Sequence, residues 1–415
     1  MNLLWLRLGW RNLWRNPGRT LVQALAIAGG LTLALFTANL TCGSYAMMIR
    51  EGARAGRGHV LVCHCDWLRE RQAELTIPAE AVRDALASEP GVLGAFARLQ
   101  LMGLAQSSRE TRGVAIVGID FAREAALHPL LASGCRIAGE LPLGALRDRA
   151  YVGERLAKQL QIEVGQKMVL SLQDRGGRIV GLLARIAGIY RTGIPTADAQ
   201  MVFVDRARLA AAFGSPGEAH EVAVLLADPA AAPGLLGRLG GAIALPRDGR
   251  ACDWQEAMPE MAGAIRTDRV MNTFIMAIIF GLIALGAVNT LLMNVAERTR
   301  EFGLLKALGV GPAAIRRMVV AEAFALALLG TAAGVTGAGA ITWYFARHGL
   351  DLTALLEGKL EVAGVLFEAR VYPRWDLVKM AWETAAMVVL VLLAAVYPSR
   401  HALRISPADA MRTYQ

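Results

Sequence analysis

Val295-Ala-Glu-Arg-Thr-Arg-Glu-Phe-Gly-Leu-Leu-Lys-Ala-Leu-Gly-Val-Gly311 is a short charged segment between two long apolar runs, residues 270–294 and 318–345. Each run is long enough to cross a bilayer as a helix. The segment and the residues just after it are rich in arginine and lysine, which by the positive-inside rule places it in the cytoplasm. The sequence therefore predicts a membrane hairpin whose turn faces the cytoplasm.

The same segment also has an amphipathic pattern. Its apolar residues recur at near-helical spacing, and glycine follows the last of them at position 309, so we predict a short helix that ends there. The charged members of the segment are Glu297, Arg298, Arg300, Glu301 and Lys306, and the apolar ones are Phe302, Leu304, Leu305 and Leu308. Gly303 inside the helix costs about 1 kcal/mol relative to alanine, which favours a close approach to another backbone there. An apolar, charged helix at the cytoplasmic surface needs a partner to dock against.

Composition supports an integral membrane protein. Of the 415 residues 55% are hydrophobic and 19% charged, and the apolar residues are gathered into long runs. The net charge is +9, but the basic residues cluster beside the apolar runs, where membrane orientation explains them. No soluble block interleaves aromatic and basic residues, so we expect no nucleic-acid partner.

Run lengths and charges predict an α-helical membrane protein with four spans, a large α+β domain inserted between the first two, and both termini in the cytoplasm. Three tryptophans alternate with arginines near the N-terminus, the pattern of an interfacial helix. We predict an interfacial helix over 1–19, spans over 20–48, 269–295, 313–346 and 377–398, an extracytoplasmic domain over 49–268, a cytoplasmic helix over 296–312, an extracytoplasmic loop over 347–376 and a cytoplasmic tail over 399–415.

The inserted domain alternates strand-like and helix-like stretches. One span on each side forces it outside, and long domains cross the membrane largely regardless of charge. The predicted strands are His59–His64, Gly113–Ile119, Lys167–Leu172, Ile179–Tyr190 and Gln200–Val204. The predicted helices are Pro78–Ala87, Glu154–Leu160, Arg206–Phe213 and Trp254–Ile265.

Small residues at four-residue spacing mark candidate helix contacts in two spans. In the first span they are Ala26, Gly30, Ala34 and Ala38, and in the third Gly330 and Gly334. The first stripe is typical of close helix packing, and the alternative is that it reflects only a high alanine content. Both interpretations stay open.

Polar residues inside the spans are functional candidates. Glu322 could serve a proton relay, but its shallow depth favours an ion pair with Arg316, Arg317 or the cytoplasmic helix. Asn289 and Asn294 favour hydrogen bonds between helices over ion binding.

The five cysteines are an odd number, so they cannot all pair. Cys63-His64-Cys65 invites a metal site, but on a strand the two thiols point to one face and the imidazole to the other. We therefore expect no metal there unless the strand is broken. Whether Cys63 or Cys65 forms a disulfide with Cys135 or Cys252 stays open. No arrangement of residues suggests a catalytic centre.

The segment from Glu297 to Gly309 resembles the signature loop of the FtsX/MacB/LolC-LolE permeases. Looser resemblances are Trp10–Thr20, Gly58–Val62, Gly113–Asp120, Val152–Ala157, Ala187–Gly193 and Pro398–Arg412. In this family the loop is a coupling helix that sits in a groove of a separate ATPase. The resemblance implies an interface to that ATPase formed by Glu297, Arg298, Arg300, Glu301, Phe302, Gly303, Leu305, Lys306, Leu308 and Gly309.

The resemblance further implies a permease in the bacterial inner membrane, with its large domain in the periplasm and membrane lipid around it. Its partners would be a cytoplasmic ATPase dimer, a second permease chain, and a periplasmic carrier or adaptor. ATP and Mg²⁺ would be bound by the ATPase, since this chain has no P-loop sequence and we expect it to bind no cofactor and to be no enzyme.

For the function, the layout favours lipoprotein release or export as in LolE. The alternatives are a MacB-type efflux permease and an FtsX-like regulator of a cell-wall hydrolase. LolC carries a hook in a longer connection where this chain has only the turn Gln173–Gly177, which argues against LolC itself.

Overall fold

The computed structural model describes residues 7, 10–125, 127–128, 131, 135–141, 148–192, 195–239, 245–351, 360–362, 365–367 and 370–404. These residues form two compact units. The helical unit comprises Met1–Tyr45, Thr267–Asp351 and Arg370–Gln415, and the α+β unit comprises Ala46–Arg266 and Leu352–Ala369.

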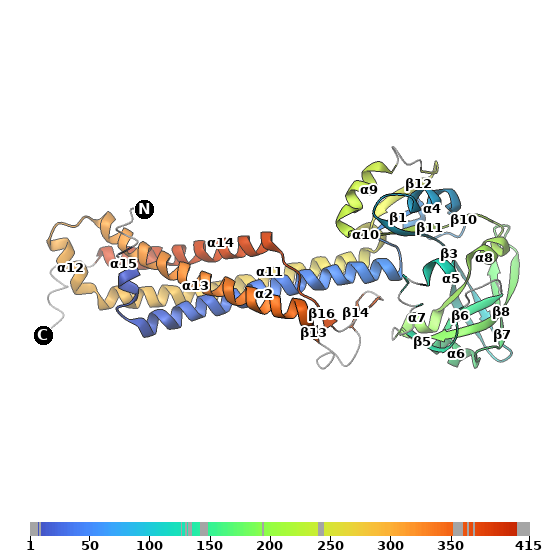
Figure 1. The fold of residues 1–415 in the computed structure, drawn as a ribbon, viewed down its shortest axis with the longest axis horizontal. Coiled ribbons are helices and arrows are strands. Elements are labelled where there is room, and N and C mark those ends of the chain that lie inside the picture. Colours follow the sequence, from blue (N-terminus) through green and yellow to red (C-terminus); the bar gives the residue numbers. More distant parts are fainter. Residues whose placement is uncertain are drawn as a thin grey trace. The chain divides into compact units, whose positions relative to one another are not determined.

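Four long apolar helices confirm the predicted spans (Figure 1). They are α2 (Pro17–Ala55), α11 (Pro259–Glu297), α13 (Pro312–His348) and α14 (Leu377–Ala394), with α12 (Thr299–Ala307) between α11 and α13, and α15 (Val396–Arg404) after α14. The first three extend beyond the predicted apolar runs because the flanking polar residues continue the helix. Part of the predicted interfacial helix and residues 405–415 of the tail lie outside the described residues.

Helix α13 is the most enclosed of the four. In the most apolar stretch of α13, 61% of the residues are buried, whereas in that of α11 only 17% are. Helix α11 therefore exposes more of its apolar surface than α13 does. The contact of α13 with α2 uses Gly330 and Gly334, as their spacing predicts. A Cβ at Gly330 would lie 2.7 Å from the Cβ of Ile27, and one at Gly334 would lie 3.0 Å from the carbonyl oxygen of Ala28.

The stripe of small residues in α2 does not form one contact face. Ala26 is exposed, whereas Ala34 and Ala38 are buried. Gly30 faces α11 of the same chain, where an added Cβ would meet the end of the Ile283 side chain at 2.1 Å. Within this chain the stripe therefore contributes contacts at Gly30, Ala34 and Ala38 and leaves Ala26 exposed.

Replacing Gly330 by leucine should destabilise the helical unit. The new side chain would collide with the β-carbon of Ile27, which cannot rotate away, and overpacking of this kind costs about 1–3 kcal/mol. Gly339→Leu on the same helix is the matched control, since nothing lies within 4 Å of its added Cβ. Thermal unfolding of the detergent-solubilised chain should show a lower midpoint for Gly330→Leu only. Equal midpoints for both variants would contradict the contact.

Two of the hydrogen-bonded ties between the membrane helices start from α2, and the sequence pattern identified neither of them. Asn39 of α2 is fully buried, and its side chain donates to Thr342 Oγ1 of α13 at 3.1 Å. The same side chain accepts from the backbone of Asp376 at 3.1 Å, just before α14. The second tie joins Thr290 of α11 to Gln23 of α2 at 2.9 Å.

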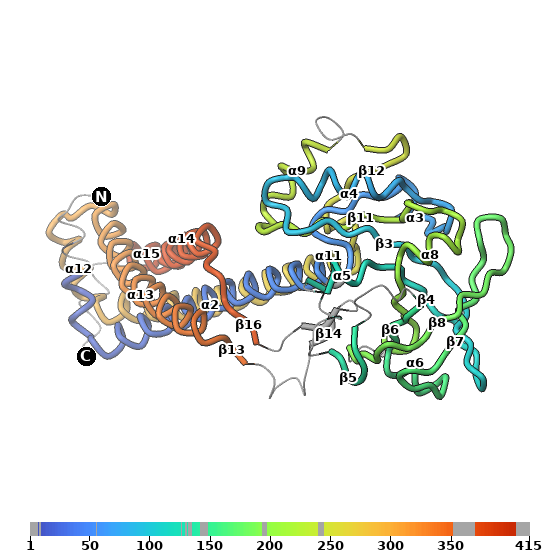
Figure 2. The backbone as a smooth tube through the Cα atoms, turned by 45° about the vertical axis from the view of Figure 1, so that its right-hand side comes forward, coloured from blue at the N-terminus to red at the C-terminus, as the bar shows by residue number. Residues whose placement is uncertain are grey.

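The α+β unit is built around one sheet in the order β12-β1-β11-β3-β4-β9-β6-β8-β5, with β7 pairing to both β3 and β8. The last pairing closes β3, β4, β9, β6, β8 and β7 into a six-stranded barrel. Figure 2 follows β3 from the strands around β11 to those around β4 and β7. The strands are β1 (Val60–His64), β3 (Val92–Gln106), β4 (Thr111–Ile119), β5 (Arg136–Gly139), β6 (Arg149–Gly153), β7 (Lys167–Gln173), β8 (Ile179–Tyr190), β9 (Met201–Asp205), β11 (Glu221–Leu226) and β12 (Gly249–Asp253).

Each half of this sheet has its own core. One cluster fills the barrel, with Leu99, Ile116 and Val202 fully buried. The other lies between the β1–β11 strands and the helices around them, with Val60, Leu86 and Val224 fully buried. The helices are α3 (Trp67–Glu70), α4 (Ala79–Ala87), α5 (Phe121–Glu124), α6 (Glu154–Leu160), α7 (Pro195–Gln200), α8 (Arg206–Phe213), α9 (Ala232–Arg238) and α10 (Trp254–Ala257), with a 3₁₀ turn at Pro229–Ala231.

Most predicted elements of this unit match within one or two residues, but Trp254–Ile265 is not one helix. It breaks after Ala257, and Pro259 begins α11. Short pairs complete the strands. In the α+β unit they are β2 (Ile77–Pro78) with β10 (Glu218–Ala219), and β14 (Leu360–Val362) with β15 (Val365–Phe367). The pair of β13 (Leu350–Asp351) with β16 (Arg370–Val371) belongs to the helical unit.

Candidate functional site

Helix α12 forms where the amphipathic pattern predicts it, and Gly309 ends it. Gly309 has a positive φ of 85°, which glycine adopts without strain. Its amide donates to the carbonyl of Lys306, and the amide of Val310 donates to that of Leu305, both at 3.0 Å. These two bonds are the Schellman ending, which satisfies the last carbonyls of a helix. The helix is therefore a defined unit of nine residues with a sharp stop.

The inner face of α12 packs into the helical unit. Phe302 is 1% exposed and lies in a cluster with Val295, Ile315 and Met318. Gly303 is buried as well. Phe302 and Gly303, which were predicted to be anchors for another protein, are thus covered by their own chain. Leu305 is half-buried against the same cluster.

The outer face of α12 carries a different set of residues. Leu304 is 63% exposed and Leu308 73% exposed, and they lie four residues apart, on one face. Arg300 continues this face toward the start of the helix and is exposed too. We call Arg300, Leu304 and Leu308 the outer stripe. Leu304 was not among the predicted interface residues, since spacing alone does not tell which apolar face of α12 is covered.

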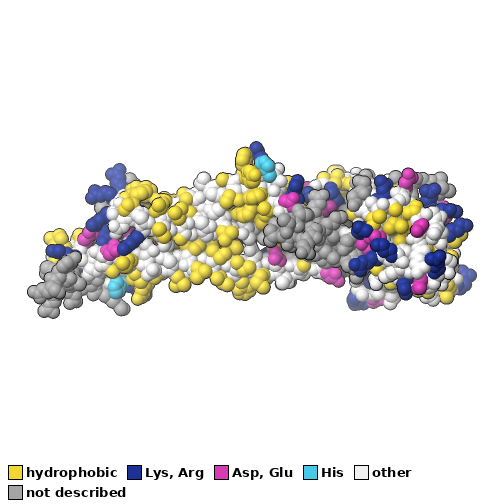
Figure 3. Space-filling view, turned by 90° about the horizontal axis from the view of Figure 1, so that it is seen from below, with side chains coloured by type: hydrophobic (Ala, Val, Ile, Leu, Met, Phe, Trp, Pro, Cys, Tyr) yellow, Lys and Arg dark blue, Asp and Glu magenta, His cyan; other side chains and the backbone are white. Residues whose placement is uncertain are grey.

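Exposed basic residues follow α12 in the sequence. Arg316 and Arg317, near the start of α13, are exposed. Figure 3 shows hydrophobic side chains over the helical unit and lysine and arginine at its α12 end. This arrangement is typical of a cytoplasmic membrane boundary.

Arg298 connects α12 to α13 inside the unit. Its Nη1 donates to Glu322 Oε2 at 3.1 Å, and its Nε donates to Glu301 Oε2 at 3.0 Å. Asn294 donates to the other oxygen of Glu322 at 3.0 Å. Glu322 is 6% exposed, so these partners offset its burial. The expected ion pair of Glu322 with the cytoplasmic helix is present, and it is made by Arg298, while Arg316 and Arg317 point to solvent.

The segment before α2 is also tied to α12, which the sequence did not predict. Arg15 Nη1 pairs with Glu301 Oε1 at 2.6 Å. Glu297 accepts hydrogen bonds from Asn16, at 3.0 Å, and from Arg19. Burial by itself would raise the pKa of Glu301, but the hydrogen bonds from Arg298 and Arg15 outweigh it and lower the pKa. No sequence signal could link positions about 280 residues apart.

Two further predicted residues take different places. Lys306 donates to the carbonyl of Leu403 in α15 at 2.7 Å, so it contributes to the packing of the unit. Asn289 is exposed on α11, and the expected hydrogen bond between helices is made by Asn294 instead.

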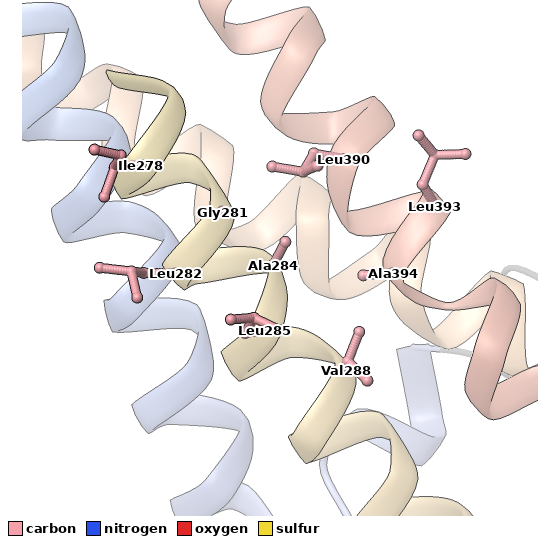
Figure 4. Close-up of a pocket in the computed structure, with 9 residues that line it drawn as sticks. All are labelled: Ile278, Gly281, Leu282, Ala284, Leu285, Val288, Leu390, Leu393 and Ala394. Carbon is pink, nitrogen blue, oxygen red and sulfur yellow. The ribbon is translucent and has the colours of Figure 1, made fainter. Parts of the chain in front are cut away.

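A groove of about 500 Å³ opens between α11 and α14 on the helical unit (Figure 4). All nine lining residues are apolar or glycine, so only contacts by dispersion are available to whatever lies against it. The lining consists of Ile278, Gly281, Leu282, Ala284, Leu285, Val288, Leu390, Leu393 and Ala394. This surface suits a bilayer and offers no group for chemistry.

Comparisons with known proteins agree with this arrangement. Residues 273–407, which include α12, match the model of the FtsX-like permease C-terminal family. The lipoprotein-releasing system transmembrane protein LolC of Neisseria meningitidis serogroup B is 24% identical over 337 residues, 78% of each chain. The macrolide export ATP-binding/permease protein MacB of Rhodopirellula baltica is 30% identical over 131 residues, 31% of this chain and 16% of that one.

Among solved structures, the periplasmic region of MacB from Actinobacillus actinomycetemcomitans aligns with a TM-score of 0.36 at 10% identity. The alignment covers 49% of this chain and 93% of that one. The four apolar helices, together with bacterial relatives of this kind, indicate a multi-pass protein of the bacterial inner membrane. The family match over α11 to α15 and the similarity to LolC along most of its length identify the chain as a relative of the FtsX/MacB/LolC-LolE permeases of ABC transporters.

Proposed function

We propose that this chain is the membrane subunit of an ABC transporter whose separate cytoplasmic ATPase docks on the outer stripe of α12. The observation that supports the proposal is that α12 has one buried face and one exposed apolar face. Phe302 and Arg298 fix its inner face to α13, while Leu304 and Leu308 stay exposed at a basic membrane boundary. Members of this family work with cytoplasmic ABC ATPases and a second permease chain, and exposed leucines of this kind suit such a protein contact.

In this mechanism the ATPase supplies ATP hydrolysis, and α12 passes its movement to the membrane helices. A displacement of the outer stripe reaches α13 through the Phe302 cluster and the Arg298–Glu322 pair, and reaches the start of α2 through Glu297 and Glu301. Because packed side chains transmit displacement with little compression, α13 and α2 would move with α12. The α+β unit would then change shape in the periplasm.

Lipoprotein release or export is the cargo function that we propose first. Its support is the relationship to LolC over 78% of both chains. The connection between β7 and β8 is the tight turn expected from sequence, closed by a hydrogen bond from the amide of Asp174 to the carbonyl of Arg178 at 2.8 Å. It leaves no room for a hook, so recruitment of a carrier would fall to the second permease chain.

MacB-type efflux is the second candidate, supported by the higher identity to MacB over a shorter segment. In that case a periplasmic adaptor would replace the carrier. An FtsX-like regulator remains a weaker alternative, because the α+β unit extends over more than 200 residues and such regulators carry a smaller outer domain.

Purification of the tagged chain from its native membrane tests the proposal. An ATPase subunit should co-purify, the complex should hydrolyse ATP, and the chain freed of that subunit should not, since it has no phosphate-binding loop. ATP added to membrane vesicles should then release lipoproteins to a carrier. Hydrolysis by the separated chain would contradict the docking proposal, and co-purification of an adaptor with no lipoprotein release would favour efflux.

A further inference from the structure

A cluster of metal-ligating side chains lies in the α+β unit, where β1 ends. Strand β1 stops at His64, and α3 begins at Trp67, so Cys65 and Asp66 occupy the turn between them. The alternation of a strand, on which the expectation of no metal rested, therefore ends one residue before Cys65. Cys63 points the other way. It is 1% exposed and lies in a cluster with Cys252 and Trp67.

The turn brings three different ligand atoms together. Cys65 Sγ lies 3.7 Å from His64 Nδ1 and 3.4 Å from Asp66 Oδ2, and these last two atoms are 3.9 Å apart. In a tetrahedral zinc site, bonds of about 2.0–2.3 Å place such ligands about 3.4–3.6 Å from one another. The observed separations are within about 0.5 Å of these values. Small rotations of the three side chains would give one ion all three ligands.

The backbone holds this turn in place without the ion. The amide of Cys65 donates to the carbonyl of Asp248, beside β12, at 2.9 Å. Asp66 is the N-cap residue just before α3, but its carboxylate makes no capping bond to that helix. Its Oδ2 accepts from the Cys65 thiol instead, and Arg69 approaches the other oxygen at 3.9 Å. The carboxylate is therefore directed at the thiol and available to a cation.

We propose that His64 Nδ1, Cys65 Sγ and Asp66 Oδ2 bind one Zn²⁺ or a similar borderline divalent ion, with water in the fourth position. Binding replaces the S–H bond of Cys65 by a sulfur–metal bond and releases that proton to solvent. It also displaces the hydrogen bond that the amide of Asp66 donates to His64 Nδ1 at 3.2 Å. The mixture of sulfur, nitrogen and oxygen disfavours Mg²⁺ and Ca²⁺, which take oxygen ligands.

The proposed site would exchange its metal ion with solvent. Cys65 is exposed, and the carboxylate of Asp66 is 45% exposed, so the ion can enter and leave from solvent. Three protein ligands with an open position differ from the closed four-ligand sites that hold structural zinc. The site would therefore report the metal content of the compartment around the α+β unit, and it does not depend on the proposed ATPase docking.

Cobalt binding to the full-length chain tests the proposal. The chain is purified in detergent without a histidine tag and freed of metal by chelation. One equivalent of Co²⁺ should produce a thiolate-to-cobalt charge-transfer band, and Zn²⁺ should abolish it by displacement. The band should be lost in Cys65→Ser, and the affinity should fall on the order of 100-fold or more in His64→Gln and Asp66→Asn. Glu70→Gln, which removes a nearby exposed carboxylate, is the matched control and should bind as the parent does.

The outcomes separate this site from the other four thiols. A charge-transfer band that persists in Cys65→Ser would place the metal on another cysteine and overturn the proposal, as would unchanged affinity in His64→Gln and Asp66→Asn together. Thermal unfolding of each metal-free variant should match the parent, because these side chains contribute little to the core. A loss of binding with unchanged unfolding would therefore be a loss of ligands.

Discussion

The double substitution Leu304→Asp/Leu308→Asp should abolish binding of the ATPase subunit and leave the permease folded. Both side chains are exposed on the outer stripe, so aspartate there costs the free chain little. In an interface, central apolar anchors are worth about 2 kcal/mol or more each. Burying two carboxylates in their place should weaken binding by at least about 100-fold. Pull-down of the ATPase and stimulated ATP hydrolysis measure the effect.

Two controls make this result specific to α12. Ile179→Asp introduces the same charge at a residue of the α+β unit that is 83% exposed, and it should leave ATPase binding unchanged. Phe302→Ala should instead lower the thermal stability of the helical unit, because emptying a buried phenylalanine site costs about 3–5 kcal/mol. Parental ATPase binding by the double aspartate variant would show that the outer stripe is not the docking surface.

Arg98→Met should destabilise the α+β unit by about 3–5 kcal/mol, because it leaves the carboxylate of Glu124 buried without its partner. Arg98 is 5% exposed and Glu124 1% exposed, and Nη2 of Arg98 lies 2.7 Å from Oε2 of Glu124. The guanidinium also donates to the carbonyl of Gly56. Faster hydrogen exchange in β3 and β11 of the full-length chain would report this loss of stability, because Arg98 lies in β3 opposite Glu221 of β11.

The matched control for this pair lies on the neighbouring strand. Arg112→Met breaks the exposed pair with Glu110, at 3.4 Å, and should change stability by less than about 1 kcal/mol. Replacing both buried partners, by Arg98→Met/Glu124→Leu, should restore much of the loss, because no charge is then left buried. Equal exchange in Arg98→Met and Arg112→Met would mean that water reaches Glu124 in solution.

Much of the fold was predictable because its signals are local. Long apolar runs identify the spans, and Lys167–Gln173 and Ile179–Tyr190 alternate as strands with one covered face. Strand β3 was missed because it belongs to both halves of the sheet. Its residues 95–99 are buried on both faces, so no alternation is visible there. The closure of the barrel could not be predicted either, because pairings such as Leu104 with Ser171 join segments that are far apart in sequence.

At α12, too, contacts with residues far away in the sequence could not be predicted. Phe302, Leu304, Leu305 and Leu308 all fit a helical apolar pattern, but only the packing of α13 and α15 decides that Phe302 is covered and Leu304 is not. Gly309 was predicted correctly because the end of a helix depends on local backbone geometry. The partners of Glu297 and Glu301 come from residues 15–19, and a charge pattern cannot choose among so many arginines.

The buried side chain of Asn39 also constrains how the protein is made. Its partner Thr342 lies 303 residues later in the chain. At about 5–20 residues per second, the ribosome needs about 15–60 s to synthesise that stretch. During this interval α2 is already in the membrane, and the amide of Asn39 must find a temporary partner in water, lipid headgroups or the insertion machinery. The helical unit can therefore mature only after synthesis has passed α13, so a chain truncated before that point would carry an unsatisfied amide in its first span.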